Sequence, residues 1–236
     1  MTDVPSKSQV TKAGRRLRRA FSDGPGPPDL QDFNEALEVL IAFRAAHAGP
    51  LRKANMGPRS VVSTEGCRVE VSQRLKRIPT ILDKLIREPT MALGNMGDIG
   101  GCRAVLDSVA EVRRVELRLR KNRPPVTYQD YVKTPKASGY RAVHLVVVYD
   151  SRRIEVQLRT RIMHEWAYTV ERLSGRLGGD LKNSRGPEPV QAWLGIVSAA
   201  MALDEAGLAV DETMMAEVGR LREAAMPHLL LGGGRS

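Results

Sequence analysis

Aromatic residues, cysteines and long apolar runs are all scarce in this chain. Aromatics make up 4% of its 236 residues, so a tyrosine inside a polar stretch is more informative than usual. Cys67 and Cys102 are the only cysteines and form no CxxC pair, which argues against a cysteine-based zinc site and is typical of a reduced, cytoplasmic protein. No run approaches the roughly 18 apolar residues of a membrane span, and no apolar core follows the basic N-terminus as in a signal peptide. We therefore expect a cytoplasmic protein without a membrane partner.

Acidic residues are outnumbered by basic ones. Lysine and arginine total 37 against 27 aspartates and glutamates, which gives a formal net charge of +10. Much of the excess lies in residues 1–22 and 111–123, whose local net charges are +5 and +4. Either segment alone is typical of a solvated basic helix or tail. A polyanion larger than a nucleotide would explain both segments together.

Glycine and proline divide the chain near its N-terminus, where Gly24 to Pro28 consists of these two residue types and breaks any helix. We expect residues 1–28 to form a basic N-terminal segment and linker, in which Lys12 to Phe21 could form a helix. Residues 29–205 predict one folded domain. Residues 206–236 predict a C-terminal helix and a flexible tail.

Helices are predicted where apolar residues recur every three or four positions after a capping residue. Asp29 is a candidate N-cap, Pro79 suits the first turn of a second helix, and Ser108 with Glu111 makes a capping box for a third. Apolar stripes predict three more helices, over residues 163–173, 190–206 and 211–226.

A rigid basic loop leads into a predicted strand. Pro135, Lys136 and Gly139 come directly before Tyr140. Residues 142–149 are apolar apart from His144 and rich in β-branched side chains, which is typical of a strand buried on both faces.

A second strand follows the polar turn at 150–152 and completes a hairpin. Glu155, Gln157 and Arg159 alternate with apolar residues, so this strand has one apolar and one polar face. An ordinary solvated strand has the same alternation. The basic loop before the hairpin favours a site for a nucleotide polyphosphate and its metal instead.

Two carboxylates are candidate metal ligands. Asp98 begins a predicted strand over residues 98–106 beside a glycine pair, and Glu155 lies on the polar strand face. Mg²⁺ usually takes one or two protein carboxylates together with phosphate oxygens and water. A helix N-terminus at Pro79, flanked by cations, favours phosphate. These residue types suit phosphoryl transfer, although spacing alone leaves open whether the two carboxylates meet.

Four motifs in series resemble the RelA/SpoT synthetase domain, most closely that of the small, single-domain alarmone synthetases. The motifs are Arg74-x-Lys76-x-x-x-Thr80-Ile81-x-x-Lys84, Asp98-Ile99-x-Gly101-x-Arg103, Tyr131…Pro135-Lys136-x-x-Gly139-Tyr140-Arg141-x-x-His144 and Glu155-Val156-Gln157-Leu158-Arg159-Thr160. The resemblance covers about residues 40–205. It implies an α+β fold in which a mixed, largely antiparallel sheet is flanked by helices, as in nucleotidyltransferase-like synthetases.

The resemblance implies an ATP-dependent pyrophosphokinase that transfers the β,γ-pyrophosphate of ATP to the 3′-hydroxyl of GTP or GDP, making (p)ppGpp and releasing AMP. Catalysis and Mg²⁺ binding would fall to Asp98 and Glu155, with Glu155 completing the metal site or activating the hydroxyl. Arg74 and Arg103 would sandwich the adenine of ATP.

The remaining site residues follow from the same resemblance. Those that would hold the ATP phosphates are Lys76, Thr80 and Lys84. Tyr140 would stack on the acceptor guanine. The other acceptor-side residues would be Lys136, Arg141, His144, Gln157 and Arg159.

Three positions depart from the family pattern. Thr80 replaces the usual serine and keeps the hydroxyl. His164 stands where many members have asparagine, and Glu171 with Arg172 replaces a Glu-His pair, shifted by one residue. We therefore assign His164 no role from the sequence.

Two alternatives to nucleotide synthesis remain open. A toxin of the same family would pyrophosphorylate the 3′ end of tRNA by the same chemistry, block translation and have an antitoxin partner; the two basic segments favour it. A catalytically silent RNA-binding module is the third reading, and Asp98, Glu155 and the paired arginines argue against it. The sequence does not decide the oligomeric state.

Overall fold

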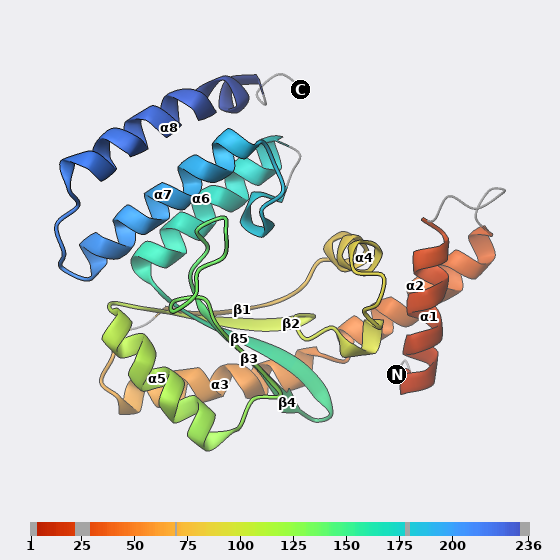
Figure 1. Ribbon diagram of the computed structural model, residues 1–236. Helices are drawn as coiled ribbons and strands as arrows, with labels where there is room; N and C mark the ends of the chain where they lie inside the picture. Colours follow the sequence, from red (N-terminus) through yellow and green to blue (C-terminus); the bar gives the residue numbers. More distant parts are fainter. Residues whose placement is uncertain (1–3, 22–28, 69, 178–179, 232–236) are drawn as a thin grey trace.

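A single five-stranded sheet forms the centre of the computed structural model, which describes residues 4–21, 29–68, 70–177 and 180–231 (Figure 1). The strands are β1 (Glu70–Leu75), β2 (Gly100–Leu106), β3 (Thr127–Asp130), β4 (Val143–Tyr149) and β5 (Arg152–Thr160). Their order is β1-β2-β5-β4-β3. The β2–β5 pair is parallel and the other three pairs are antiparallel, which confirms the predicted mixed, largely antiparallel sheet.

Two helices cover one face of the sheet, α3 (Ala48–Thr64) and α5 (Val109–Asn122), as Figure 1 shows. Their apolar side chains form one core with alternate residues of β2, β4 and β5. Ser108 caps α5 as predicted, by accepting from the amide of Glu111. The sequence analysis missed α3. Its Pro50 falls in the first turn, where no amide donor is needed, and Pro58 packs in the core.

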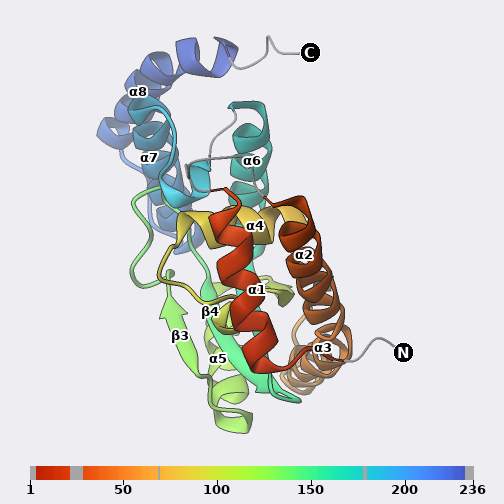
Figure 2. The same cartoon turned by 90° about the vertical axis from the view of Figure 1, so that its right-hand side faces the viewer.

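The N-terminal segment forms a helix that belongs to the folded body. α1 (Lys7–Arg19) lies beside α2 (Leu30–Ala45) and packs on α4 (Ile78–Arg87), as Figure 2 shows. It starts earlier than expected because Ser6 and Gln9 form a capping box. Asp29 caps α2 as predicted. The linker predicted at 24–28 lies outside the described residues, and the division at residue 28 stays a prediction.

The C-terminal helices form a lobe on the other side of the sheet. They are α6 (Arg161–Leu177), α7 (Glu188–Glu205) and α8 (Glu212–Leu231). The short 3₁₀ helix η2 (Leu181–Asn183) joins the same lobe between α6 and α7, whereas η1 (Leu93–Asn95) precedes β2. All three α-helices match predicted ones. The predicted flexible tail at 232–236 is not among the described residues. None of the helices described has the length and hydrophobicity to cross a membrane.

The predicted hairpin is β4 and β5, joined by a two-residue turn. Asp150 and Ser151 both have positive φ, 45° and 61°, as tight two-residue hairpin turns require. The prediction that the first strand is buried on both faces is wrong for one face. Val143, Leu145 and Val147 are buried, but His144, Val146 and Val148 on the other face are only partly covered.

The loop between β3 and β4, residues 131–142, is anchored on α7. Ser198 donates its hydroxyl proton to the carbonyl of Gly139 at 2.5 Å. Gly139 has a φ of +87°, and a Cβ there would meet Ser198 Cβ at 2.7 Å and the Leu194 carbonyl oxygen at 3.0 Å. Glycine is therefore required both by the backbone and by the close approach of α7.

We predict that Gly139→Ala lowers the free energy of unfolding by about 2–5 kcal/mol, since it adds a steric clash to a left-handed backbone. Gly207→Ala is the matched control, because Gly207 has a φ of +70° but open space around its Cβ position; it should cost only about 1–2 kcal/mol. Urea unfolding of both variants measures the difference. Equal losses would contradict the account.

Candidate functional site

A cavity of about 470 Å³ opens on the sheet face opposite α3 and α5, between β1, β2, β5, α6 and η2. Most of the side chains that line it are polar or charged. The lining residues are Ser72, Gln73, Arg74, Lys76, Asp98, Gly101, Cys102, Arg103, Glu155, Gln157, His164, Tyr168, Glu171 and Lys182. Six of the thirteen predicted site residues are therefore on its walls, including both carboxylates.

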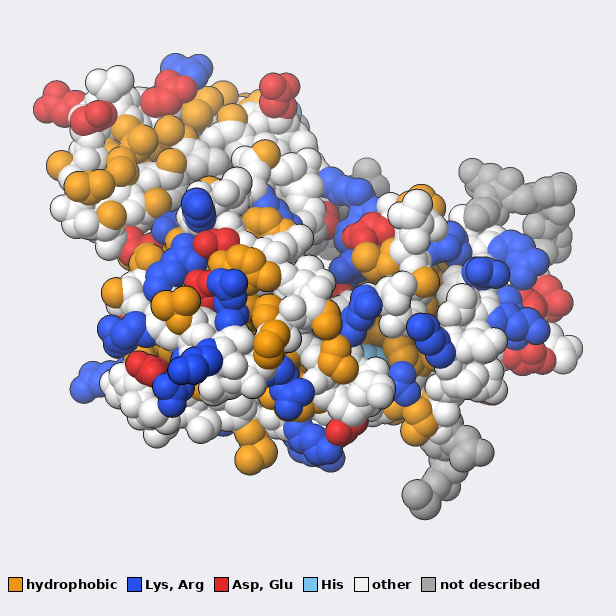
Figure 3. Space-filling view, turned by 60° about the horizontal axis from the view of Figure 1, so that its bottom comes forward, with side chains coloured by type: hydrophobic (Ala, Val, Ile, Leu, Met, Phe, Trp, Pro, Cys, Tyr) orange, Lys and Arg blue, Asp and Glu red, His pale blue; other side chains and the backbone are white. Residues whose placement is uncertain are grey.

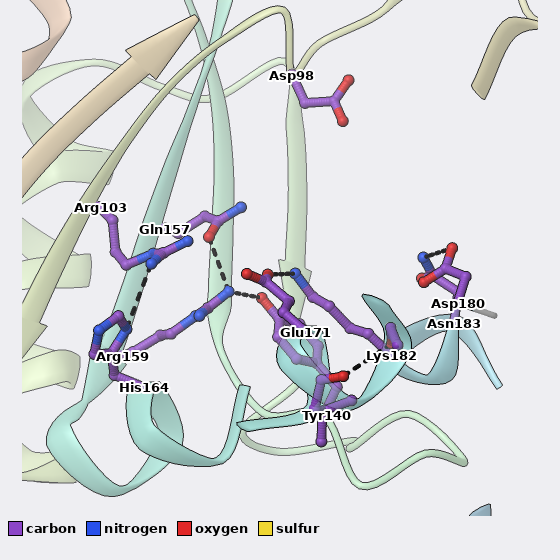
Figure 4. Close-up of polar contacts among 12 residues, drawn as sticks. Asp98, Arg103, Tyr140, Gln157, Arg159, His164, Glu171, Asp180, Lys182 and Asn183 are labelled. Carbon is purple, nitrogen blue, oxygen red and sulfur yellow. Dashed lines mark hydrogen bonds and ion pairs between the residues drawn. The ribbon is translucent and has the colours of Figure 1, made fainter. Parts of the chain in front are cut away.

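Five polar side chains form a closed ring of hydrogen bonds beside the cavity, partly visible in Figure 4. Arg159 donates from Nη2 to the Tyr140 hydroxyl at 2.6 Å and to Gln157 Oε1 at 3.0 Å. Gln157 donates to Glu155 Oε2. His144 links the remaining two, with Nδ1 2.9 Å from Glu155 Oε1 and Nε2 2.7 Å from the Tyr140 hydroxyl.

Two bond directions follow from Arg159, which can only donate, so Gln157 Oε1 and the Tyr140 oxygen accept from it. The ionised Glu155 can only accept, so His144 carries its proton on Nδ1 and donates it to Glu155. In a neutral ring Nε2 then accepts the proton of the Tyr140 hydroxyl. Burial lowers the pKa of His144, which keeps the ring neutral, and burial raises the pKa of Tyr140 to about 12, which keeps its proton in place.

Glu155 is ionised in this arrangement. Burial alone would raise its pKa, but the hydrogen bonds that Glu155 accepts from His144 and Gln157 act in the opposite direction and lower the pKa. Such a carboxylate is a weak base at neutral pH. The Glu155 carboxylate can instead accept hydrogen bonds and bind a positively charged group.

Asp98 lies at the opposite end of the labelled cluster in Figure 4. Its Oδ2 is 2.9 Å from Lys76 Nζ and 3.1 Å from Lys84 Nζ, and burial, which would raise its pKa, is outweighed by these two cations. Its Oδ1 is buried without a hydrogen-bond partner among the described residues. A free carboxylate oxygen in a cationic pocket fits a ligand of Mg²⁺.

The site fits a metal that takes most of its ligands from a nucleotide. Across the described part of the chain, no three His, Cys, Asp or Glu side chains gather as a metal site. Asp98 offers one open oxygen, while both oxygens of Glu155 already accept hydrogen bonds. One or two protein carboxylates with phosphate oxygens is the usual arrangement for Mg²⁺.

Arg74 and Arg103 lie on the same face of neighbouring strands. Arg103 pairs with Ser72, two residues from Arg74, in the β1–β2 register, so the two guanidinium groups are diagonal neighbours. His164 reaches Arg103 from α6 through a long hydrogen bond, 3.4 Å between Nδ1 and Nη1. Burial and the Arg103 charge lower the pKa of His164. We assigned His164 no role from the sequence, and in the structure its side chain supports Arg103.

Thr80 and Lys136 stand apart from the cavity wall. Thr80 is exposed in the first turn of α4 and makes no hydrogen bond with any described residue. Lys136 is half-buried, and its Nζ donates to Asn183 Oδ1 at 2.9 Å. Their predicted phosphate contacts stay predictions.

Two predicted acceptor residues are placed otherwise than expected. The Tyr140 side chain is 0% exposed and its ring contacts Tyr131, His144 and Trp166, so it offers no free face to a guanine base. Arg141 is buried in an ion pair with Glu205 of α7, 3.0 Å apart, and does not line the cavity. Packing of the 131–142 loop on α7 causes both differences.

Tyr168, Glu171 and Lys182 are among the cavity residues to which we assigned no role from the sequence. Glu171 and Lys182 face each other, 3.4 Å apart. Lys182 lies between the predicted helices over residues 163–173 and 190–206, three positions after Gly179. A lysine near a pair of glycines is too weak a signal to single it out.

Comparison with known proteins identifies the family. A model described as "Region found in RelA / SpoT proteins" matches residues 73–172. The GTP pyrophosphokinase YjbM of Bacillus subtilis is 32% identical over 166 residues, covering 65% of this chain and 74% of that protein. The GTP pyrophosphokinase rsh of Brucella melitensis is 28% identical over 184 residues, which cover 67% of this chain but only 24% of that longer protein.

The fold agrees with solved structures. The crystal structure of small alarmone synthetase 1 from Bacillus subtilis, bound to its product pppGpp, matches with a TM-score of 0.63 at 24% identity. The match covers 78% of this chain and 97% of that one. The mixed sheet and its cationic cavity thus define a nucleotidyltransferase-like synthetase domain. The chain belongs to the RelA/SpoT family, as an enzyme of the GTP pyrophosphokinase type.

We predict that Tyr140→Phe lowers the free energy of unfolding by about 1–3 kcal/mol, because it leaves buried groups of Arg159 and His144 without a partner. Tyr168→Phe is the control, since the Tyr168 side chain is half-exposed and its hydroxyl bonds no described residue; it should change stability by less than about 0.5 kcal/mol. Denaturant unfolding compares the two. An unchanged free energy of unfolding in Tyr140→Phe would show that the ring of hydrogen bonds does not form.

Proposed function

We propose that the protein transfers the β,γ-pyrophosphate of ATP to the 3′-hydroxyl of GTP or GDP, making (p)ppGpp and releasing AMP. The observation that carries the proposal is one cavity lined by both Glu155 and Asp98, whose Oδ2 pairs with two lysines and whose Oδ1 is open. The relatives support it: YjbM is a GTP pyrophosphokinase, and small alarmone synthetase 1 has been crystallised with pppGpp and with AMPCPP.

The donor end of the site comprises Asp98, Lys76, Lys84 and the two diagonal arginines. Mg²⁺ held by Asp98 would neutralise polyphosphate charge when bound. Lys76 and Lys84, which now pair with Asp98, are placed to turn to the phosphates. Arg74 and Arg103 would stack on the adenine, with His164 fixing the plane of Arg103.

The acceptor end centres on Glu155 and Gln157. The acceptor's 3′ oxygen attacks the β-phosphorus, the bond from the β-phosphorus to the α,β-bridging oxygen breaks, AMP leaves with that oxygen, and the hydroxyl proton passes to water. Since Glu155 is a weak base, we propose that it orients the hydroxyl by accepting its hydrogen bond. Phosphoryl transfer of this kind depends mainly on positioning and electrostatics.

Transfer from ATP labelled at the γ-phosphate tests the proposal. With Mg²⁺ and GTP or GDP, and no RNA, the wild-type protein should form a labelled guanosine nucleotide together with AMP. Label that appears only after tRNA is added would overturn the nucleotide acceptor in favour of RNA. No label with any acceptor, alongside RNA binding, would favour a silent module.

We predict that Asp98→Asn lowers transfer at least about 100-fold, because it removes the charge that would hold the metal. Asp83→Asn, on the exposed side of α4 and away from the cavity, is the matched control and should retain wild-type activity. Initial rates at saturating Mg²⁺ make the comparison. Full activity of Asp98→Asn would remove Asp98 from the site.

The tRNA acceptor is the second candidate, favoured by basic side chains on α5. Arg118 and Lys121 are exposed and pair with no described residue, and Figure 3 shows Lys and Arg gathered over this helix and again near α1. On α1, Arg16 pairs with Asp32 and Glu35, so exposed Arg15 and Arg19 are the better residues to neutralise. Under this alternative, charge reversal at Arg118 and Lys121 weakens RNA-dependent labelling and its dependence on salt.

A further inference from the structure

Lys182 projects into the cavity from η2 and has little to neutralise it. Its side chain is 20% exposed, and its ion pair with Glu171 is long, 3.4 Å, with the Glu171 side chain 40% exposed. Its ammonium lies 4.5 Å from the centroid of the buried Tyr140 ring. An ion pair of this length, with one partner largely exposed, stabilises a fold very little. A purely structural role therefore does not explain why the mostly buried Lys182 side chain lies here.

The backbone around Lys182 is fixed from three directions. Ser138 of the 131–142 loop donates to the Lys182 carbonyl at 2.8 Å. Asp180 pairs with Arg87 of α4 at 2.9 Å. On the other side, Asn183 accepts from Lys136. The segment that carries the Lys182 ammonium is therefore held in place by contacts with neighbouring elements.

The charges that face Lys182 come from every neighbouring element. Arg159 and Glu155 lie on β5, Arg103 on β2 and Glu171 on α6, while the neutral His144 and Tyr140 complete its surroundings. Burial, and next the Arg159 charge, lower the pKa of Lys182 to about 8. A desolvated ammonium beside an arginine gains more from an added anion than a solvated one does.

We propose that Lys182 binds the phosphate chain of the acceptor nucleotide. The position favours the acceptor, because Lys182 faces Glu155, on which the proposed acceptor end centres, and lies away from Asp98 and its two lysines (Figure 4). It also supplies the cation that Arg141 does not, since Arg141 is paired with Glu205 outside the cavity. When the acceptor nucleotide binds, the Lys182 ammonium leaves its ion pair with Glu171 and contacts phosphate oxygens instead. This assignment rests on the proposed function.

Binding and transfer together test the proposal. Lys182→Met should weaken binding of GTP, measured by calorimetry without ATP, at least about 10-fold, and raise the KM for GTP similarly while the KM for ATP changes less than about twofold. Lys133→Met is the matched control, because Lys133 is an exposed lysine of the 131–142 loop whose side chain contacts no described residue. It should behave as wild type.

The pH dependence separates a phosphate ligand from a structural lysine. Lys182 is charged below its pKa of about 8, so GTP binding by the wild type should fall as pH rises through that value. Lys182→Arg stays charged and should keep its GTP affinity up to pH 9.

The outcomes distinguish this assignment from the proposed function. GTP affinity unchanged in Lys182→Met, or no GTP binding by the wild type, would overturn the assignment. Lys182-dependent GTP binding without any transfer would uphold it and overturn the proposed function. Stability measured by unfolding shows that the variants are folded.

Discussion

The buried guanidinium of Arg159 is the constraint on which the site depends. It is 1% exposed, and a buried charge needs acceptors for its donors. Tyr140 and Gln157 accept from its Nη2, and the chain of bonds closes through His144 and Glu155, while its Nε has no partner among the described residues. Together with the ionised Glu155, Arg159 sets which atoms of the ring carry protons, although it does not line the cavity itself.

The same ring couples the cavity to the C-terminal lobe. Tyr140 belongs to the apolar core of that lobe together with Trp166 and Leu194, and the neighbouring Gly139 is held by Ser198 of α7. Packing of α7 therefore sets the position of the ring's hydroxyl and, through His144, of Glu155. At the other end of the 131–142 loop, Arg113 of α5 forms an ion pair with Asp130, which precedes the loop.

Patterns of neighbouring residues predicted the elements that are determined by interactions between residues close in sequence. Asp29 and Ser108 cap helices, and the polar face of β5 carries Glu155 and Gln157 into the cavity as expected. Helix α3 and edge strand β3 were missed, since prolines and an exposed four-residue strand give no clear periodicity. The burial of Tyr140, the Arg141–Glu205 pair and the place of Lys182 depend on contacts between distant segments. No local pattern encodes those contacts.

The proton on His144 is the most direct measure of the ring. Nitrogen-15 spectra of imidazole-labelled protein, with His144 assigned from the loss of its signals in His144→Asn, report both charge and tautomer at neutral pH. The account predicts a neutral imidazole protonated on Nδ1, because Tyr140 donates to Nε2 and Glu155 accepts from Nδ1. A positively charged imidazolium, or a neutral ring protonated on Nε2, would contradict it.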